Sequence, residues 1–296
     1  MNRNGIFYAL GAYVLWGVFP IYWKWLHNVS AIQVIGHRIG WSFILLMIVI
    51  FTTRQWTKFR SNLTRRMLGI YLIASLLLSA NWLIYVWGVN AGHIVEASLG
   101  YFINPLFSVL LGMIFLKERL RPLQWFPIGL AALGVIYLTW TYGSLPWIAI
   151  SLAFTFGFYG LVKKTAPLGS LYGLTLETGL VFVPALGYLF YAESTGQGAF
   201  GHTGVISDLL MIGTGAVTTV PLLMFASAAK HIPLTIIGIM QYIAPTLQFL
   251  IGVLIYKESF TTNQLIGFSM IWVALIIFWV EEVYAHRAQK TIVEVA

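Results

Sequence analysis

Ten apolar runs, each long enough to cross a bilayer as a helix, constrain this sequence more than any other feature. An α-helix needs ~20 apolar residues to cross the ~30 Å hydrocarbon core. Stretches such as 44–50 do not alternate polar and apolar residues as the strands of a membrane β-barrel would. Because lipid offers the backbone no hydrogen-bond partners, we expect an all-α membrane protein with ten transmembrane helices. The predicted spans are 5–23, 31–51, 68–89, 94–116, 122–140, 144–162, 170–192, 206–227, 234–256 and 263–280.

The composition excludes a soluble fold. Charged residues make up 9% of the chain, against roughly 25% in an ordinary soluble domain, and apolar residues make up 59%. The net charge of +8 comes from too few side chains to build a basic face, so we expect the lipid bilayer and no nucleic acid as a partner. The chain has no cysteine for a disulfide or a sulfur-ligated metal. The first run lacks a small-residue cleavage site and is interpreted as a retained span.

Lys and Arg are distributed unevenly between the two sides of the predicted bundle. If the N-terminus is cytoplasmic, fourteen of the 17 lie in cytoplasmic segments, Lys24 and Lys257 lie outside, and Arg38 lies within the second span. Cytoplasmic loops of membrane proteins carry such an excess. The sequence therefore predicts a multi-pass protein of the cell membrane with both termini in the cytoplasm.

A shift of 140 residues brings the two halves of the chain into register. The matched pairs include Gly17 with Gly157, Lys24 with Lys164, Pro105 with Pro245, and Lys117-Glu118 with Lys257-Glu258. The constant offset predicts two five-helix repeats, residues 1–141 and 142–296. Because five is odd, the second repeat enters the membrane from the opposite side.

An inverted repeat of this kind favours a transporter. In such architectures the substrate binds near the bilayer midplane between the repeats, and rocking of one repeat against the other alternates the access. We expect the substrate to contact the first, third, fourth, sixth, eighth and ninth spans. The alternative is an old duplication that is kept only for helix packing.

Several stretches form recognisable motifs: AYVLWG at 12–17, HRIGWS at 37–42, NWL at 81–83, EASLGYFINPL at 96–106, FYGLV at 158–162, TTVP at 218–221 and QYI at 241–243. With these motifs the sequence resembles the EamA family of the drug/metabolite transporter superfamily, in its RarD type, over nearly the whole chain. The resemblance implies a bacterial inner-membrane permease, linked by name to chloramphenicol sensitivity. It implies no particular substrate, and it brings no catalytic residues and no cofactor.

Two other classes of function stay open beside a secondary-active transporter of a small metabolite or drug-like solute. An intramembrane hydrolase is opposed by the lack of a His-Glu-x-x-His motif and of paired aspartates, although a Ser–His pair is an option. A passive channel or scramblase is the other alternative. The chain has no phosphate-binding loop, which excludes an ATP-driven pump. A homodimer is left open.

Two ionisable residues stand deep inside predicted spans, where charge is costly and often functional. The Arg38 guanidinium is a candidate to bind an anionic group of the substrate. The alternative is a structural cation that holds helix ends together through their backbone carbonyls. Glu177 is a candidate proton carrier, because a carboxyl group in apolar surroundings can exchange protons as access alternates. An Arg38–Glu177 ion pair and two separate sites are both open. Glu96, near the outer end of the fourth span, favours an exposed or helix-capping role.

Polar and aromatic side chains inside the spans complete the candidate substrate site. Pro105 and Pro245 occupy matched positions, and proline breaks in corresponding spans point to a midplane site. Trp16 and Trp82 lie well inside their spans, where they could stack on a planar substrate. Amide and hydroxyl groups lie beside the two prolines or within the third span, and the alternative for each is a hydrogen bond between helices. These polar candidates are Asn81, Tyr101, Asn104, Gln241 and Tyr242.

Overall fold

The computed structural model describes residues 3–90, 94–143, 146–257 and 261–295, and it is helical throughout. The elements are α1 (Arg3–Trp25), α2 (Ala31–Thr52), α3 (Trp56–Ser61), α4 (Arg65–Asn90), α5 (Ile94–Phe115), the 3₁₀ turn η1 (Pro122–Gln124), α6 (Trp125–Tyr142), α7 (Trp147–Thr165), α8 (Ser170–Ser194), α9 (Val205–His231), α10 (Leu234–Met240), α11 (Ile243–Leu250), the π-helical turn η2 (Ile251–Ile255) and α12 (Thr262–Val295).

The expected all-α membrane architecture is confirmed in its coarse form. Within the described residues, eight helical stretches are long and apolar enough to cross a bilayer, and Leu99–Phe115 is a shorter apolar helix. The sixth predicted span corresponds to α7, which is helical but carries Lys163 and Lys164 in its last turn. The eight stretches are Arg3–Trp25, Ala31–Thr52, Arg65–Tyr85, Pro122–Thr141, Ser170–Ser194, Val205–His231, Leu234–Ile255 and Thr262–Ala285.

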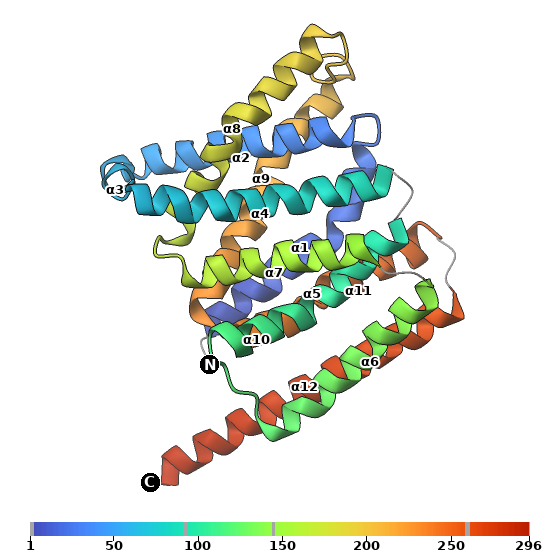
Figure 1. Cartoon of the computed structure of the whole chain (residues 1–296). Helices are drawn as coiled ribbons and strands as arrows, with labels where there is room; N and C mark the ends of the chain where they lie inside the picture. Colours follow the sequence, from blue (N-terminus) through green and yellow to red (C-terminus); the bar gives the residue numbers. More distant parts are fainter. Residues whose placement is uncertain (1–2, 91–93, 144–145, 258–260, 296) are drawn as a thin grey trace.

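The helices run back and forth between two ends of one bundle (Figure 1). Both ends of the chain and the short helix α3 lie at the same end of the bundle, on the left in Figure 1. α5 ends at this end and is followed by η1 and α6, whereas η2 ends at the opposite one. Lys117 and Lys257 therefore lie at opposite ends.

Helices from the two halves of the chain interleave. α1 packs against α9 and α11, and α7 packs in the corresponding way against α4 and α5. α2 lies against α8 and α9, and α5 lies against α10. The α6–α12 pair stands at one edge of the bundle (Figure 1), where Nε and one terminal nitrogen of Arg121 donate to the Glu281 carboxylate at 2.8 and 2.9 Å.

The expectation of paired proline breaks is wrong for the first half. α5 is a continuous helix from Ile94 to Phe115 through Pro105. The ninth predicted span does break, between α10 and α11, at Gln241 and Tyr242. α10 approaches α5 closely at this point, because a Cβ on Gly238 of α10 would stand 2.7 Å from the Pro105 carbonyl oxygen.

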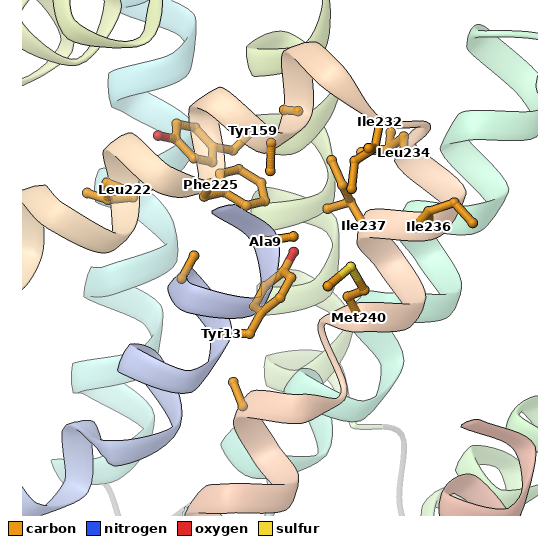
Figure 2. Packing of buried hydrophobic residues seen from close by; sticks show 14 of the residues in the cluster. Ala9, Tyr13, Tyr159, Leu222, Phe225, Ile232, Leu234, Ile236, Ile237 and Met240 are labelled. Atoms are coloured by element: carbon orange, nitrogen blue, oxygen red, sulfur yellow. The ribbon is translucent and has the colours of Figure 1, made fainter. Parts of the chain in front are cut away.

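The apolar core is densest where α1, α7, α9 and α10 meet (Figure 2). Ala9 and Tyr13 of α1 pack there against Phe225 of α9 and Ile237 and Met240 of α10, and each is at most 1% exposed. Ala9 lies nearer the start of α1 than Tyr13 does, so this cluster occupies the half of the bundle toward the N-terminus. The other half is left for the cavity described next.

Candidate functional site

A cavity of about 260 Å³ lies between helices from both halves of the chain. Tyr13 forms its floor above the apolar cluster, and the cavity extends along α1 to Trp23, close to the end of that helix. Its lining residues are Tyr13, Trp16, Phe19, Pro20 and Trp23 of α1; Arg38 of α2; Leu78, Asn81, Trp82 and Tyr85 of α4; Tyr101 and Asn104 of α5; Phe156 of α7; Leu222 of α9; Gln241 at the break; and Ala244, Pro245 and Gln248 of α11.

Seven of the eight residues predicted to bind substrate line this one cavity. They come from four helices and from the break between α10 and α11, which lie far apart in the sequence. They are Trp16, Arg38, Asn81, Trp82, Tyr101, Asn104 and Gln241.

Tyr242, the eighth, is not among the residues that line the cavity. Its side chain is fully buried, and its hydroxyl donates to the Phe102 carbonyl oxygen at 3.1 Å. Successive residues on a helix point about 100° apart, so Gln241 and Tyr242 do not share a face. Tyr242 joins α11 to α5 and has a packing role here.

Arg38 is the cation of the cavity wall. Its guanidinium lies between two indole rings, with Cζ 4.9 Å from the Trp23 ring centre and 4.3 Å from that of Trp82. Its Nε donates to Thr218 Oγ1 at 3.0 Å. Within the described part of the chain, this is its single hydrogen bond and no carboxylate lies within ion-pair distance. The two terminal NH₂ groups are therefore left without protein partners there.

The amides of the cavity wall fall into two groups. The Asn81 side-chain nitrogen is committed, because it donates to the Leu152 carbonyl and to Thr155 Oγ1, both at 2.9 Å. Gln248 likewise donates to the Trp16 carbonyl at 3.0 Å. Asn104 differs, because it is only 3% exposed and its Oδ1 has no hydrogen-bond partner among the described residues. A buried acceptor without a donor is costly, so Asn104 is a position at which a ligand can contribute.

Glu177 does not belong to this cavity. Its carboxylate accepts from Lys163 Nζ at 2.6 Å and from the Tyr159 hydroxyl at 3.1 Å, and the Glu177 and Lys163 side chains are 1% and 3% exposed. Arg38 and Glu177 thus occupy separate sites, and the Arg38–Glu177 ion pair considered from the sequence is not formed. Lys163, in the last turn of α7, is thus a buried residue held by this pair.

A stack of aromatic rings connects the buried ion pair with the floor of the cavity. Tyr159 stacks on Phe225 with ring centres 6.1 Å apart, and Phe225 contacts Tyr13 and Trp16 at 6.4 and 5.6 Å. Figure 2 shows Tyr159 and Phe225 side by side, with Tyr13 near them. A continuous series of aromatic contacts thus joins the Tyr159 end of the ion pair to the cavity lining.

Comparison with known proteins places this arrangement in a family. The profile of the EamA-like transporter family matches residues 3–140. The chain is 45% identical to the uncharacterised transporter YojE of Bacillus subtilis over 98% of each chain. It is 42% identical to Protein RarD of Escherichia coli over 97% of each chain. The chain belongs to the EamA-like transporter family.

The fold of this EamA-family transporter also occurs in a solved crystal structure. That structure shares 15% sequence identity with it at a TM-score of 0.69, over 94% of this chain and 98% of the other. At this level of identity the likeness concerns the fold alone. This EamA-family transporter is thus a multi-pass helical membrane protein, in agreement with the resemblance noted in its motifs.

Several lining residues of this EamA-family transporter were not selected from the sequence. On α1, Phe19, Pro20 and Trp23 follow Trp16 at three, four and seven positions, and on α4, Leu78 and Tyr85 flank Trp82 at four and three. Residues at these spacings share one face of a helix. A search for residues three, four or seven positions from each candidate on the same helix would have found them. The side chains of Asn90 and Glu96 lie outside those that the structure describes, and within the described residues no cluster of His, Asp and Glu could hold a metal ion.

Proposed function

We propose that this chain is a secondary-active transporter of a small solute that works by alternating access, with the cavity as its substrate site. The observation that carries the proposal is a cavity of about 260 Å³ between the two halves of the chain, above a packed apolar cluster. A cavity lined from both halves changes its access when the halves move against one another. A packed floor gives the protein one closed side, as a transporter needs in each of its states.

Matched details at a spacing of 140 residues support two inverted five-helix repeats, 1–141 and 142–296. Lys117 and Lys257, which follow the corresponding helices, have backbone φ angles of 54° and 57°. A Cβ on Gly17 would stand 2.6 Å from Leu247, and one on Gly157 would stand 2.5 Å from Phe107. These are the same contact made twice, because both the glycines and their partners are 140 positions apart. Repeats of this kind supply two related states of similar energy.

The distribution of Lys and Arg supports cytoplasmic termini in the cell membrane. The apolar cluster then faces the cytoplasm, and the cavity occupies the outer half of the membrane. The conformation is accordingly closed to the cytoplasm.

Proton coupling belongs to this proposal, with Glu177 as the coupling residue. Protonation would remove the charge that holds Lys163 at 2.6 Å and would free a buried ammonium in the closed half. A buried cation without its counter-ion is strongly unfavourable, so α7 and α8 would separate there. The ring stack from Tyr159 through Phe225 to Tyr13 offers a physical link to the cavity.

The alternatives are less well supported by the cavity. None of its described lining residues is Ser, His, Asp or Glu, so a hydrolase would find no nucleophile–base pair there. A passive channel needs a continuous path, whereas the floor holds Ala9, Phe225, Ile237 and Met240 at 1% exposure or less.

Side-specific cysteine labelling tests the proposal, because the chain has no cysteine of its own. Phe19→Cys lies in the cavity and outside the apolar cluster, whereas Ile237→Cys lies in that cluster. In the double variant, a bulky impermeant maleimide applied from outside should react with position 19 and protect position 237 from a reagent applied to the cytoplasmic face. Independent reaction at the two positions would contradict alternating access. Lys117→Cys and Lys257→Cys, labelled from opposite faces, serve as the topological control.

A further inference from the structure

The unusual feature of the cavity is a guanidinium that has no anionic partner in the described chain. Arg38 makes one hydrogen bond there, from Nε to Thr218. A cation inside the membrane-spanning part of a protein is normally paired with an anion or surrounded by acceptors. No acidic side chain is among the described residues that line the cavity, so a bound ligand can supply the counter-charge.

Three neighbours position the Arg38 guanidinium. Its Cζ lies over the Trp23 and Trp82 rings, 4.9 and 4.3 Å from their centres, and its Nε donates to Thr218. The terminal NH₂ edge is left to bind. Two parallel N–H groups on such an edge match the two oxygens of a carboxylate. A single fixed fork suits a monoanion better than a phosphate dianion, which would call for a second cation.

The rest of the wall is mainly aromatic. Trp16 and Phe156 meet edge to face with ring centres 5.8 Å apart, and Tyr85 and Tyr101 do so at 5.7 Å. Such a lining presents ring faces and edges to a planar group. Among its described residues there is no carboxylate that could pair with an organic cation.

We propose that the cavity binds an aromatic monocarboxylate, with its carboxylate on the terminal NH₂ edge of Arg38 and its ring among the aromatic side chains. The inference rests on the cavity being the substrate site of the transporter. Asn104 Oδ1, buried and without a partner among the described residues, offers an acceptor to a donor group that such a ligand carries elsewhere. The substrate class is thereby distinguished from cationic and uncharged aromatic solutes.

The test measures the binding of small ligands to the purified protein, by tryptophan fluorescence and by calorimetry. Trp16, Trp23 and Trp82 line the cavity and report its occupancy. The probes are 3-phenylpropionate, 3-phenylpropan-1-ol, 3-phenylpropylamine and 3-cyclohexylpropionate. We expect the phenyl acid to bind at least tenfold more tightly than the alcohol or the amine, and severalfold more tightly than the cyclohexyl acid. Equal or tighter binding of the amine or the alcohol would overturn the assignment.

Two variants of Arg38 and one matched control locate the effect. Arg38→Gln should remove the preference for the acid over the alcohol, and Arg38→Lys, which keeps the charge but loses the fork, should weaken acid binding about tenfold. Lys24→Gln is the control, because Lys24 lies over the Tyr256 ring at 4.4 Å and is outside the cavity lining. If Arg38→Gln does not fold, the test of the carboxylate site rests on Arg38→Lys. Acid binding unchanged in Arg38→Lys, or lost equally in Lys24→Gln, contradicts the inference.

Transport assays separate this inference from the proposed function. Counterflow of labelled 3-phenylpropionate into proteoliposomes should follow its binding. Selective binding without any counterflow would leave the ligand class intact and reject the transporter. Counterflow of the amine or the alcohol without binding of the acid would support the transporter and reject the ligand class.

Discussion

The carboxylate of Glu177 lies 2.6 Å from the ammonium of Lys163, and both side chains are almost completely buried. The pair joins α8 to α7, with Tyr159 as a third member at 3.1 Å. It lies apart from the cavity that holds Arg38. Among the described residues, the half-buried Arg38 on the cavity wall and the buried Glu177–Lys163 pair are thus separate charged sites.

Breaking this pair on one side should cost more than removing it altogether. Lys163→Met leaves a buried carboxylate without its cation, and the loss of one partner typically costs about 3–5 kcal/mol. In the double variant Lys163→Met/Glu177→Gln no unpaired charge is left, so part of the stability should return. Thermal unfolding in detergent of both single variants and the double variant measures this. A double variant that is less stable than either single one would contradict the account.

Glu177 should also govern pH-driven uptake. Glu177→Gln has no group to titrate at this position, so we expect it to lose uptake driven by a pH gradient while retaining solute exchange. The measurement compares both activities in proteoliposomes. The Lys163→Met/Glu177→Gln variant keeps the comparison valid if the single variant is unstable. Unchanged pH dependence in both would remove Glu177 from the coupling role.

The carboxylate of Glu118 caps the start of α10, and its removal should loosen the closed end. Its two oxygens accept from the backbone N–H groups of Leu234 and Thr235 at 2.7 and 2.9 Å. The loss of a cap costs about 0.5–2 kcal/mol. Glu118→Ala should therefore raise the rate at which Ile237→Cys reacts from the cytoplasmic face severalfold. Glu193→Ala, which removes an exposed carboxylate paired with His202, is the control and should leave that rate unchanged.

Gly17 and Gly157 permit the two matched close contacts between helices, and alanine should be poorly tolerated at both. At Gly17 the new Cβ would stand 2.7 Å from Leu247 Cβ, and at Gly157 it would stand 2.5 Å from Phe107 Cδ1. Overpacking of this kind costs about 1–3 kcal/mol. Gly69→Ala is the control, because nothing lies within 4 Å of the place its new Cβ would take and alanine favours a helix by about 0.5–1 kcal/mol. Similar thermal stability of all three variants would argue against the tight contacts.

Asn104 and Gln241 should matter for binding more than for folding. Asn104 Oδ1 has no partner to lose among the described residues, so Asn104→Ala should weaken the binding of 3-(4-hydroxyphenyl)propionate, whose hydroxyl can donate to that oxygen, without lowering thermal stability. Gln241→Ala should weaken it too, since Gln241 lines the cavity and its side-chain bond to Ser108 is long at 3.5 Å. Asn81→Ala provides the contrast, because it loses two bonds of 2.9 Å and should be less stable. Normal binding in the first two variants would mean that the site lies elsewhere.

Much of the candidate site was accessible from residue type and depth. A polar or charged side chain inside an apolar span has few places to lie except a cavity or a helix contact, which is why Arg38, Asn81 and Asn104 were recognised. Tyr242 differs from them, because its hydroxyl donates to the Phe102 carbonyl oxygen and it is not among the residues that line the cavity. Lys163 was not selected, because it stands at a helix end and resembles an ordinary loop cation.

The sequence by itself determined the helices, because a span of about twenty apolar residues in lipid must satisfy its backbone hydrogen bonds internally. It also determined the family, through motifs spread along the whole chain. Only the tertiary structure decided that Glu177 pairs with Lys163 and that Arg38 stands between Trp23 and Trp82 with no acid beside it among the described residues. The physical reason is rotation: which face a helix turns toward its neighbours depends on the packing of all of them together. No local pattern of residues encodes that angle.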